Sequence, residues 1–430
     1  MNEHAVSGWR SSSFGSLCLR IVNGGTPETG NPAYWNGETP WITGADFIAN
    51  GIGEFRRFVS DAGIRGSATS VVKQGNLLVV TRTGVGKLAI APCDIAISQD
   101  ISGVYINTDR AETSFVYYLL LRELDELKKL NQGTSINGII RSDLEEHIVR
   151  FPVSKSTQRK IAEILSGIDK VIEKTEALIT KYQQIKAGLM HDVFTRGVLS
   201  NGQLRPSREQ APELYQETKI GWIPREWDLK RCADLCKRIC VGIVIQPTQY
   251  YVDEGVPALR SANVREDGID PINFVYISAA SNQLLAKSQV KAGDIVSVRT
   301  GYPGTSAVIP PEFQGANCID ILISTPGERI NSEYLCDWIN SSFGKGQVLR
   351  QQGGMAQQHF NVGEMRELLV ALPDLDEQIK IRSKINAVAS KLAIDRVFLE
   401  KLRRQKLGLM QDLLTGKVQI KVDAPEAAYA

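Results

Sequence analysis

The stretch TRTGVGKLAI (Thr81–Ile90) has the residue types of a phosphate-binding loop, with glycines followed by a lysine. A Walker-type loop needs a glycine five residues before its Gly-Lys pair and a Ser or Thr after it, because backbone amides wrap the phosphates and the hydroxyl binds Mg²⁺. Here Thr81 stands at the glycine position and Leu88 follows Lys87. The spacing therefore argues against a nucleotide site and predicts that Lys87 is an ordinary loop cation.

The cysteines and histidines show no metal-binding or nucleophile motif. None of the seven cysteines lies in a Cys-x-x-Cys pair, and none of the four histidines lies in a His-x-x-x-His pair. Cys232, Cys236 and Cys240 would share one face of a helix, either as metal ligands or, as we favour, as small apolar residues facing a core. We therefore predict reduced thiols, no metal site and no cofactor.

The stretch NPAY (Asn31–Tyr34) differs by one residue from the Asn-Pro-Pro-Tyr loop with which DNA methyltransferases hold a flipped adenine. That chemistry also needs a glycine-rich cofactor-binding segment ahead of the loop, and only 30 residues precede it. A methyltransferase is therefore a disfavoured alternative.

The composition is that of a multidomain protein. A chain of 430 residues with 43% hydrophobic residues allows about two to four domains. Its 50 Lys and Arg against 48 Asp and Glu give a net charge of +2, which neither requires nor excludes a nucleic-acid partner. The start has no signal-like apolar core, and no apolar run approaches the roughly 20 residues of a membrane span. We expect a cytoplasmic protein without membrane contact.

The chain contains an internal duplication. KAGLMHDVFTRGV (186–198) and KLGLMQDLLTGKV (406–418) are related by an offset of 406 − 186 = 220, which extends backwards for more than fifty residues. Nearer each start the offset is 217 or 218, so that WITGADF (Trp41–Phe47) matches ALRSANV (Ala258–Val264). Self-similarity at a fixed offset indicates two copies of one structural unit.

The loop at Thr81 has a partner in the second copy. VKQGNLLVVTRTGVG (Val72–Gly86) corresponds to VKAGDIVSVRTGYPG (Val290–Gly304), with one residue inserted in the first copy, and the shared features are Val-Lys-x-Gly, an apolar strand and Arg-Thr-Gly. The Gly-Lys pair is absent from the second copy, which removes the remaining support for a nucleotide loop. The alignment predicts that Arg82 and Arg299 are equivalent.

Each copy combines a globular part with a long helical part. Strand-like runs at Asn76–Val80 and Asp294–Val298 and a helical pattern at Ser114–Leu130 predict an α+β domain. The predicted boundaries are a globular domain at 1–150, a helical region at 151–198, a linker at 199–220, a second globular domain at 221–370, a second helical region at 371–418 and a tail at 419–430.

Both helical regions carry a two-seam heptad pattern over about five heptads, so each needs a partner, either the duplicate helix or its own globular domain. Thr175 and Asp395 are polar residues at equivalent inner positions, where they would fix the register of a helix pair or else face solvent. The residues assigned to helix pairing or partner docking are Ile161, Leu165, Ile168, Ile172, Thr175, Ile179, Ile381, Ile385, Val388, Leu392, Asp395 and Leu399.

Four segments, through their order and duplication, resemble the specificity subunit of type I restriction-modification systems. They are GWIPREWDLKRCADLC (Gly221–Cys236), GDIVSVRTGYPG (Gly293–Gly304), LPDLDEQIKI (Leu372–Ile381) and LMHDVFTRG (Leu189–Gly197). The resemblance covers Trp9 to Val418.

The resemblance implies a non-catalytic subunit. Two tandem target-recognition domains, separated by two long antiparallel coiled-coil-like helices, would each read one half of a bipartite site on double-stranded DNA in pseudo-two-fold geometry. The helices would dock two methyltransferase subunits, which in turn associate with motor-nuclease subunits. One departure concerns docking: Ser156-Thr157-Gln158 stands where the second copy has Asp376-Glu377-Gln378, so the acidic pair is missing and a Ser or Thr is expected to cap the helix there.

Polar, glycine-flanked loops supply the candidates for DNA contact, because Arg, Asn and Gln read base edges while Lys, Ser and Thr mostly position the backbone. The alternatives are that the arginines brace a turn by pairing with a carboxylate and that QQGGMAQQHF is an ordinary polar loop. At the level of function, the alternatives are the specificity subunit of a related non-type-I restriction-modification enzyme and a coiled-coil scaffold without a DNA role. The candidate residues are Arg82, Thr83, Gly84, Lys87, Arg260, Arg299, Thr300, Gly301, Tyr302, Gln357 and Gln358.

Overall fold

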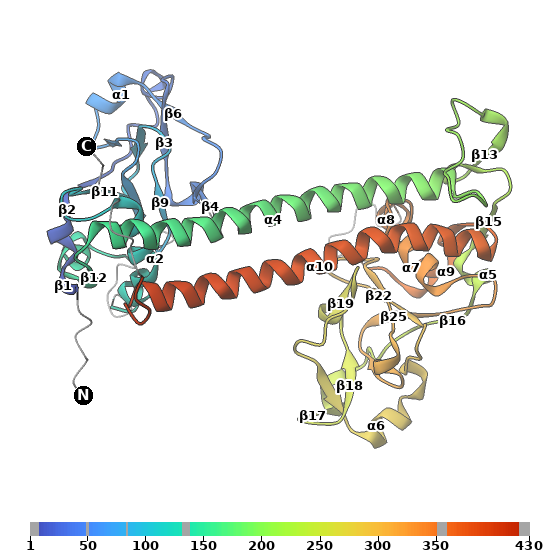
Figure 1. Cartoon of the computed structure of the whole chain (residues 1–430). Helices are drawn as coiled ribbons and strands as arrows, with labels where there is room; N and C mark the ends of the chain where they lie inside the picture. The colour runs from blue at the N-terminus through green and yellow to red at the C-terminus, as the bar shows by residue number, and fades with distance from the viewer. Residues whose placement is uncertain (1–7, 49–50, 83–84, 131–137, 351–358, 421–430) are drawn as a thin grey trace, which may run out of the picture. The chain divides into compact units, whose positions relative to one another are not determined.

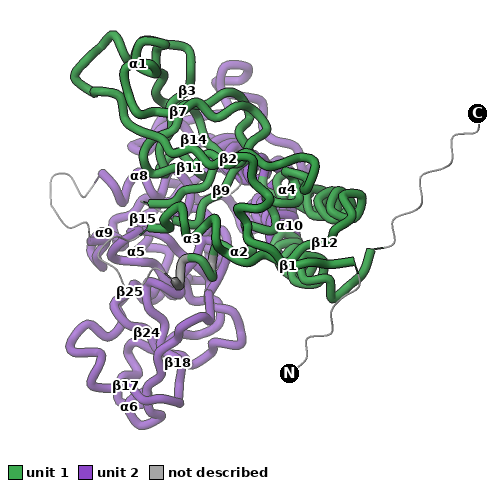
Figure 2. Tube along the Cα trace, turned by 90° about the vertical axis from the view of Figure 1, so that its left-hand side faces the viewer, with its two compact units in different colours: residues 1–176, 398–430 green, residues 177–397 purple. Residues whose placement is uncertain are grey.

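The computed structural model describes residues 8–48, 51–82, 85–130, 138–350 and 359–420 (Figure 1). The chain divides into two compact units, coloured separately in Figure 2. Unit 1 comprises residues 1–176 and 398–430, and unit 2 comprises residues 177–397.

Unit 1 contains two four-stranded sheets. The first is antiparallel, in the order β2 (Cys18–Asn23), β11 (Ile101–Ile106), β8 (Leu77–Val80) and β9 (Leu88–Ile90). The second has the order β6 (Phe58–Val59), β3 (Thr39–Ile42), β10 (Ile95–Ile97) and β7 (Ser70–Val72), with β3 and β10 parallel. The other elements are the pair β1 (Trp9–Ser13) and β12 (Ile148–Pro152), the hairpin β4 (Phe47–Ile48) and β5 (Gly51–Ile52), and the helices α1 (Asp61–Arg65), α2 (Thr113–Leu130) and α3 (Arg141–Glu146).

Unit 2 repeats the strand order of the antiparallel sheet, and its second sheet again contains one parallel pair. Its antiparallel sheet runs β16 (Cys236–Val241), β25 (Ile321–Pro326), β22 (Ile295–Val298) and β23 (Ser306–Val308), and its second sheet runs β17 (Tyr251–Val252), β21 (Val275–Ile277), β18 (Val256–Leu259) and β24 (Asn317–Cys318). The remaining strand pairs are β13 (Tyr215–Thr218) with β14 (Gly221–Pro224), β15 (Asp228–Arg231) with β26 (Leu369–Leu372), and β19 (Val264–Arg265) with β20 (Gly268–Ile269). The short helices are α5 (Cys232–Leu235), α6 (Ala279–Leu284), α7 (Ser332–Asn340), α8 (Ser342–Arg350) and α9 (Val362–Glu367).

Strand β8 is a continuous apolar run because both of its faces are covered. Leu77 and Val79 belong to the core that includes α2, whereas Leu78 and Val80 belong to the core of the second sheet. Successive side chains of a strand point to opposite faces, so one run of Leu and Val fills two cores at once. This explains why the predicted strand at Asn76–Val80 shows no polar alternation.

The predicted long helices are α4 (Lys155–Arg196, 42 residues) and α10 (Leu375–Leu413, 39 residues). Each belongs in part to both units. In unit 1, Asp169 of α4 pairs with Lys406 of α10 at 2.6 Å, and Glu176 pairs with Arg403 at 2.9 Å. Positions that rise along α4 therefore face positions that fall along α10, and the helix segments of unit 1 run antiparallel.

In unit 2 the segments of the two long helices also run antiparallel. Val193 and Phe194, near the end of α4, share a core with Ile381 and Ile385, near the start of α10. The helices thus pack on each other and also on the globular part of each unit, so the two alternatives drawn from the heptad pattern both hold.

Most of the predicted seam residues are buried, and Ile168 and Val388 are half-buried. Thr175 is 7% exposed and Asp395 is 5% exposed, which excludes the alternative that they face solvent. The Thr175 hydroxyl donates to the Val171 carbonyl at 2.7 Å, and Lys391 donates to one Asp395 oxygen at 2.7 Å. The seam is an internal surface of the molecule.

A shared glutamine fixes the start of each long helix. The Gln158 amide donates to the Pro152 carbonyl at 2.8 Å and accepts from the Glu112 backbone at 2.9 Å, next to α2. Gln378 makes the corresponding bonds with Pro373 and with Asn331, next to α7. Both glutamines are fully buried. The duplication of the sequence is therefore also a duplication of hydrogen bonds.

The acidic residue missing from the first copy has an internal role in the second. Glu377 is 6% exposed, and it pairs with Arg205, accepts from Trp227 Nε1 at 3.0 Å and accepts from the Val198 backbone at 2.7 Å. Arg205 lies in the predicted linker, whose last part continues into the β13–β14 hairpin across residue 220. Glu377 thus anchors an ordered connection.

In the first copy, Thr157 occupies the position equivalent to Glu377. The cap of α4 is Ser154, whose hydroxyl accepts from the Thr157 backbone at 3.3 Å, so the residue that caps this helix lies two positions before the predicted Ser156-Thr157 pair. The cap belongs before the first helical residue, Lys155, because that is where backbone amides lack partners.

The three spaced cysteines lie on different elements. Cys232 belongs to α5, while Cys236 and Cys240 belong to β16, so they do not share a helix face. A hydrogen bond with Cys236, at 3.7 Å between the sulfurs, and burial raise the pKa of the Cys232 thiol. Within the described ranges, no cluster of three metal-ligating side chains and no helix apolar and long enough for a bilayer is found.

Candidate nucleic-acid interface

Three segments of unit 2 run in the same direction and end at one edge. Strands β18 and β24 are parallel, and Ile243 forms a parallel bridge with Ile319. The Ile319 amide donates to the Leu259 carbonyl at 2.8 Å, and the Asp320 amide donates to the Ile243 carbonyl at 3.0 Å. The loops that follow these segments therefore emerge together. We call residues 244–246, 260–262, 299–302 and 319–320 the unit 2 edge.

Arg299 braces this edge. Its guanidinium pairs with the Asp320 carboxylate and donates through Nε to the Phe360 carbonyl at 3.3 Å. The Phe360 amide in turn donates to the Arg299 carbonyl at 2.9 Å. The Arg299 side chain is only 21% exposed. These contacts match the alternative in which the arginine stabilises a turn by pairing with a carboxylate.

The next three residues form an exposed turn. The Thr300 hydroxyl and His359 Nδ1 are 3.0 Å apart. Gly301 has a φ of +92°, a conformation that residues with a side chain rarely adopt. Tyr302 is 82% exposed, so the turn presents an aromatic ring to solvent.

The other predicted contacts of unit 2 have mixed outcomes. The Arg260 guanidinium donates through Nη2 to the Asn273 carbonyl at 2.7 Å, and its buried Nε has no partner among the described residues. Gln357 and Gln358 lie outside the described residues.

Unit 1 builds a corresponding edge from residues 26–28, 43–45, 81–82 and 98–100. Strands β3 and β10 are parallel, the Ser98 amide donates to the Ile42 carbonyl at 3.0 Å, and the Gly25 amide donates to the Ile97 carbonyl at 3.0 Å. We call this set of loops the unit 1 edge.

Apart from Ala45, the exposed side chains of the unit 1 edge are polar. The Thr26 hydroxyl donates to the Gln99 side-chain oxygen at 2.5 Å, and both residues are exposed. Arg82 is exposed, and none of the described residues pairs with its guanidinium. Thr83 and Gly84 lie outside the described residues.

Lys87 is held inside unit 1. Its ammonium donates to the Gly44 and Phe47 carbonyls, at 3.1 Å each, and so fastens the loop that leads into β4. These hydrogen bonds agree with the prediction that Lys87 is an ordinary loop cation. They also occupy the ammonium group that would be needed for contact with DNA.

Hydrogen bonds at the strand ends give the register of the duplicated loops. The Val80 amide bonds to the Lys87 carbonyl and the Val298 amide to the Thr305 carbonyl, so Val80 is equivalent to Val298. The alignment is therefore ungapped, with an offset of 298 − 80 = 218. Arg299 is equivalent to Thr81, which is buried.

The predicted equivalence of Arg82 and Arg299 is wrong. In the ungapped register Arg82 corresponds to Thr300, and Arg299 lies one residue earlier. The shared Arg-Thr-Gly sequence is displaced by one position between the two copies. The register is determined by the hydrogen bonds between the strands, and a displacement by one residue places a side chain on the other face of the sheet.

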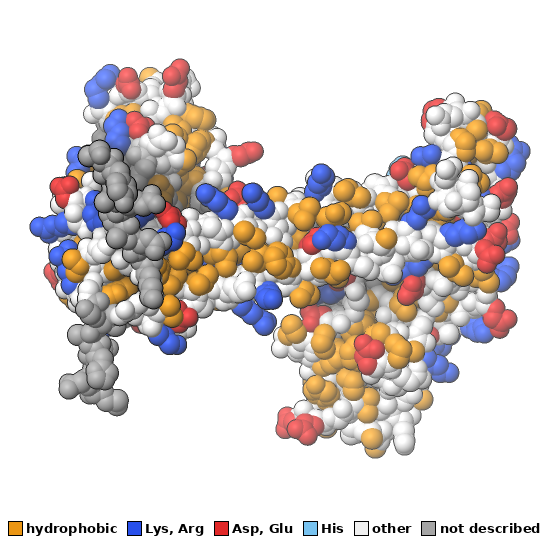
Figure 3. Space-filling model, in the orientation of Figure 1, with side chains coloured by type: hydrophobic (Ala, Val, Ile, Leu, Met, Phe, Trp, Pro, Cys, Tyr) orange, Lys and Arg blue, Asp and Glu red, His pale blue; other side chains and the backbone are white. Residues whose placement is uncertain are grey.

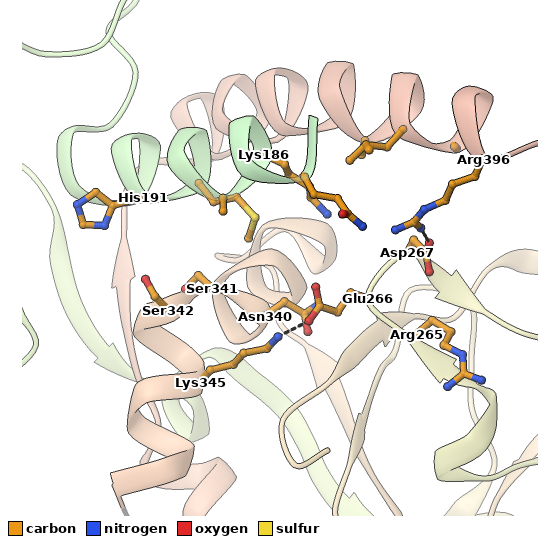
Figure 4. A pocket seen from close by; sticks show the side chains of 16 residues that line it. Lys186, His191, Arg265, Glu266, Asp267, Asn340, Ser341, Ser342, Lys345 and Arg396 are labelled. Atoms are coloured by element: carbon orange, nitrogen blue, oxygen red, sulfur yellow. Dashed lines mark hydrogen bonds and ion pairs between the residues drawn. The ribbon is translucent and has the colours of Figure 1, made fainter. Parts of the chain in front are cut away.

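A cleft of about 640 Å³ lies elsewhere in unit 2, between the long helices, α8 and the β19–β20 hairpin (Figure 4). Glu266 pairs with Lys345 of α8, and Asp267 pairs with Arg396 of α10. These ion pairs tether the hairpin to the helices. Sequence reasoning missed them because no local pattern links residues about 80 to 130 positions apart.

Both long helices also expose apolar side chains, visible as hydrophobic colouring along them in Figure 3. Unit 1 contributes Val171, Phe398 and Leu407, and unit 2 contributes Leu178, Ile185, Ile394 and Val397. These residues differ from the seam residues predicted for partner docking.

The fold and the sequence agree with one protein class. Residues 6–186 match the family model described as the type I restriction modification DNA specificity domain. The chain is 21% identical over 411 residues to the specificity subunit of the type I restriction enzyme MjaIX from Methanocaldococcus jannaschii, covering 93% of this chain and 91% of that protein. It is 24% identical over 330 residues to the MjaVIII specificity subunit of the same organism, covering 71% and 70%.

Solved structures share the fold. The S subunit of a type I restriction-modification system from M. genitalium aligns over 96% of this chain and 98% of that chain, with a TM-score of 0.59 and 15% identity. A chain from a study of assembly and conformational transition of the type I system aligns over 96% and 99%, with a TM-score of 0.56 and 16% identity. Over nearly its whole length the chain is therefore similar to specificity subunits of type I restriction-modification systems, and its residues 6–186 match the DNA specificity domain of that family.

Proposed function

We propose that this chain is the DNA-recognition subunit of a type I restriction-modification complex and that each unit reads one half of an asymmetric bipartite site. The observation that supports this most is the pair of edges. Both arise from the same strand pattern, yet they expose different side chains. A protein that reads two different half-sites with two related domains needs this combination.

The chemistry of the edges suits base reading. Threonine, glutamine and arginine side chains at the unit 1 edge can donate to and accept from base edges in the major groove. Arg82 is the strongest candidate, because its guanidinium has no described partner and remains available to a base or a phosphate.

The exposed apolar residues of α4 and α10 are the proposed docking surface for two methyltransferase subunits. Leu178 in unit 2 and Phe398 in unit 1 are equivalent at the 220-residue offset, and they are 38% and 45% exposed. One kind of partner that binds both repeats requires similar chemistry at equivalent positions. The motor-nuclease subunits would join through the methyltransferase subunits.

In this proposal the chain supplies recognition and its partners supply catalysis. Rigorously purified chain should transfer no methyl group from radiolabelled S-adenosylmethionine to DNA, whereas addition of the methyltransferase subunits should give transfer. Methyl transfer by the chain alone would contradict the non-catalytic role.

Gel shifts test DNA recognition. The chain with its methyltransferase subunits should select a split sequence from random duplexes. Selection of a continuous site would favour a related non-type-I enzyme, and no selection at all would favour a scaffold.

A further inference from the structure

The two edges can be compared residue by residue. The Gly24 and Gly242 amides donate to the Ile101 and Ile321 carbonyls, respectively. The next amides, of Gly25 and Ile243, donate to the carbonyls of the last residues of β10 and β24. Thr26 is therefore equivalent to Val244, and position 27 is equivalent to position 245.

The unit 2 edge is unusually apolar for an exposed surface. Val244 is 49% exposed, Ile245 is 76% exposed and Tyr302 is 82% exposed. The neighbouring Gln246 has a φ of +42°, so the backbone holds this loop in a left-handed conformation despite its side chain. Ile319, which is buried, takes the place of the Ser98-Gln99 segment of unit 1.

The unit 1 edge has polar residues or no side chain at these positions. Thr26 hydrogen-bonds to Gln99, the proline at position 27 is buried, and the residue at the position of Tyr302 is Gly84. The edges therefore differ in chemistry as well as in residue identity.

We propose that the unit 2 edge recognises the 5-methyl groups of thymine in the major groove, through Val244, Ile245 and Tyr302. The thymine methyl is the one apolar group that base pairs present there, and apolar side chains are its natural contacts. The unit 1 edge reads its half-site by hydrogen bonds from Thr26, Gln99 and Arg82. This inference rests on the proposed function.

Duplex DNA fits this apolar patch better than a protein partner does. A methyltransferase subunit that binds both repeats would need similar side chains at both edges. The edges instead have Thr26 in unit 1 and Val244 at the equivalent position in unit 2. Two half-sites of different sequence call for this difference. The patch also adjoins the polar Thr300 and His359, whose donors and acceptors suit base edges.

Uracil substitution tests the proposal, because uracil lacks only the 5-methyl group. The full chain with its methyltransferase subunits is titrated with duplexes in which one half-site at a time carries deoxyuridine for thymidine. We expect substitution in one half-site to weaken binding about three- to fivefold per contacted methyl, and substitution in the other to have no effect.

A Val244→Ser/Ile245→Ser variant, which keeps Tyr302, should reduce this sensitivity and thereby assign the half-site to unit 2. Leu284→Ser, which alters an equally exposed apolar residue on α6, should leave the sensitivity intact. Specific binding that is indifferent to uracil in both halves overturns the proposal while leaving the proposed function in place. Loss of methyltransferase binding in the Val244/Ile245 variant, with uracil sensitivity unchanged, overturns it in favour of a protein interface. Absence of specific binding to any duplex overturns the proposed function itself.

Discussion

Replacement of Glu377 by threonine gives the second repeat the residue that the first repeat has at position 157. In unit 2 this change removes the acceptor for two guanidinium donors of Arg205, the Trp227 indole and the Val198 amide. We expect a large loss of stability confined to unit 2.

The magnitude follows from the burial of the pair. The Arg205 and Glu377 side chains are 6% and 8% exposed, so the guanidinium would remain largely out of water. Removing one partner of a buried ion pair costs about 3–5 kcal/mol, since the other charge keeps its desolvation penalty. The exposed Glu226 carboxylate, whose Oε2 lies 2.8 Å from Arg205 Nη2, would still pair with the guanidinium. We therefore expect a cost near the lower limit, ~3 kcal/mol.

Native-state hydrogen exchange resolves the effect by unit. Amides of the β13–β14 hairpin and the first turns of α10 should lose about 3 kcal/mol of protection, and the sheets of unit 1 should keep theirs. Asp376→Ser makes the matched control, because Asp376 is exposed and the first repeat has serine there; it should cost less than about 1 kcal/mol. A Glu377→Thr variant with protection equal to that of this control would refute the reasoning.

Arg82→Ala should weaken specific DNA binding by about 1–3 kcal/mol without changing the melting temperature, since nothing described holds the side chain; unchanged affinity and salt dependence would show that Arg82 does not contact DNA. Arg299→Ala should instead lower the thermal stability of unit 2, because Asp320 and the Phe360 carbonyl lose their partner, and a variant as stable as the parent would contradict the bracing role. Burial raises the pKa of Asp337 against the opposing effect of Arg382, so the folded state binds this proton more tightly than the unfolded state does. The free energy of unfolding should therefore decrease as pH rises from about 4 through the raised pKa, a dependence that Asp337→Asn should remove in denaturant titrations; an identical pH profile in both proteins would contradict it.

The parts of the fold that sequence could predict are those with a local period. The heptads of α4 and α10 and the apolar runs of β8 and β22 appear directly in the residue order, because burial of one face or of both requires them. Because the chain is duplicated, each of these patterns appears twice in the sequence. Even the polar residues Thr175 and Asp395 were correctly singled out as inner positions of the seam.

The parts that sequence could not predict depend on contacts between distant positions. The Arg-Thr-Gly letters suggested equivalence of Arg82 and Arg299, whereas the register is determined by the strand ladder, which letters alone do not reveal. The role of Glu377 depends on Arg205, 172 positions earlier. The parallel pairing that gathers the loops of each edge is equally non-local, so the edges emerge only in three dimensions.

Methylome sequencing of cells that carry the chain and its methyltransferase subunits tests the central claim most directly. Helix α4 is continuous and contributes residues to both units, so four residues inserted after Glu176, with four after Val397 of α10, lengthen each helix by about 6 Å. At ~3.4 Å per base pair this corresponds to one or two base pairs. The account predicts a bipartite methylated site whose halves stay unchanged while the gap between them grows by that amount. An active variant that methylates the original site, or methylation that does not depend on the chain at all, would contradict it.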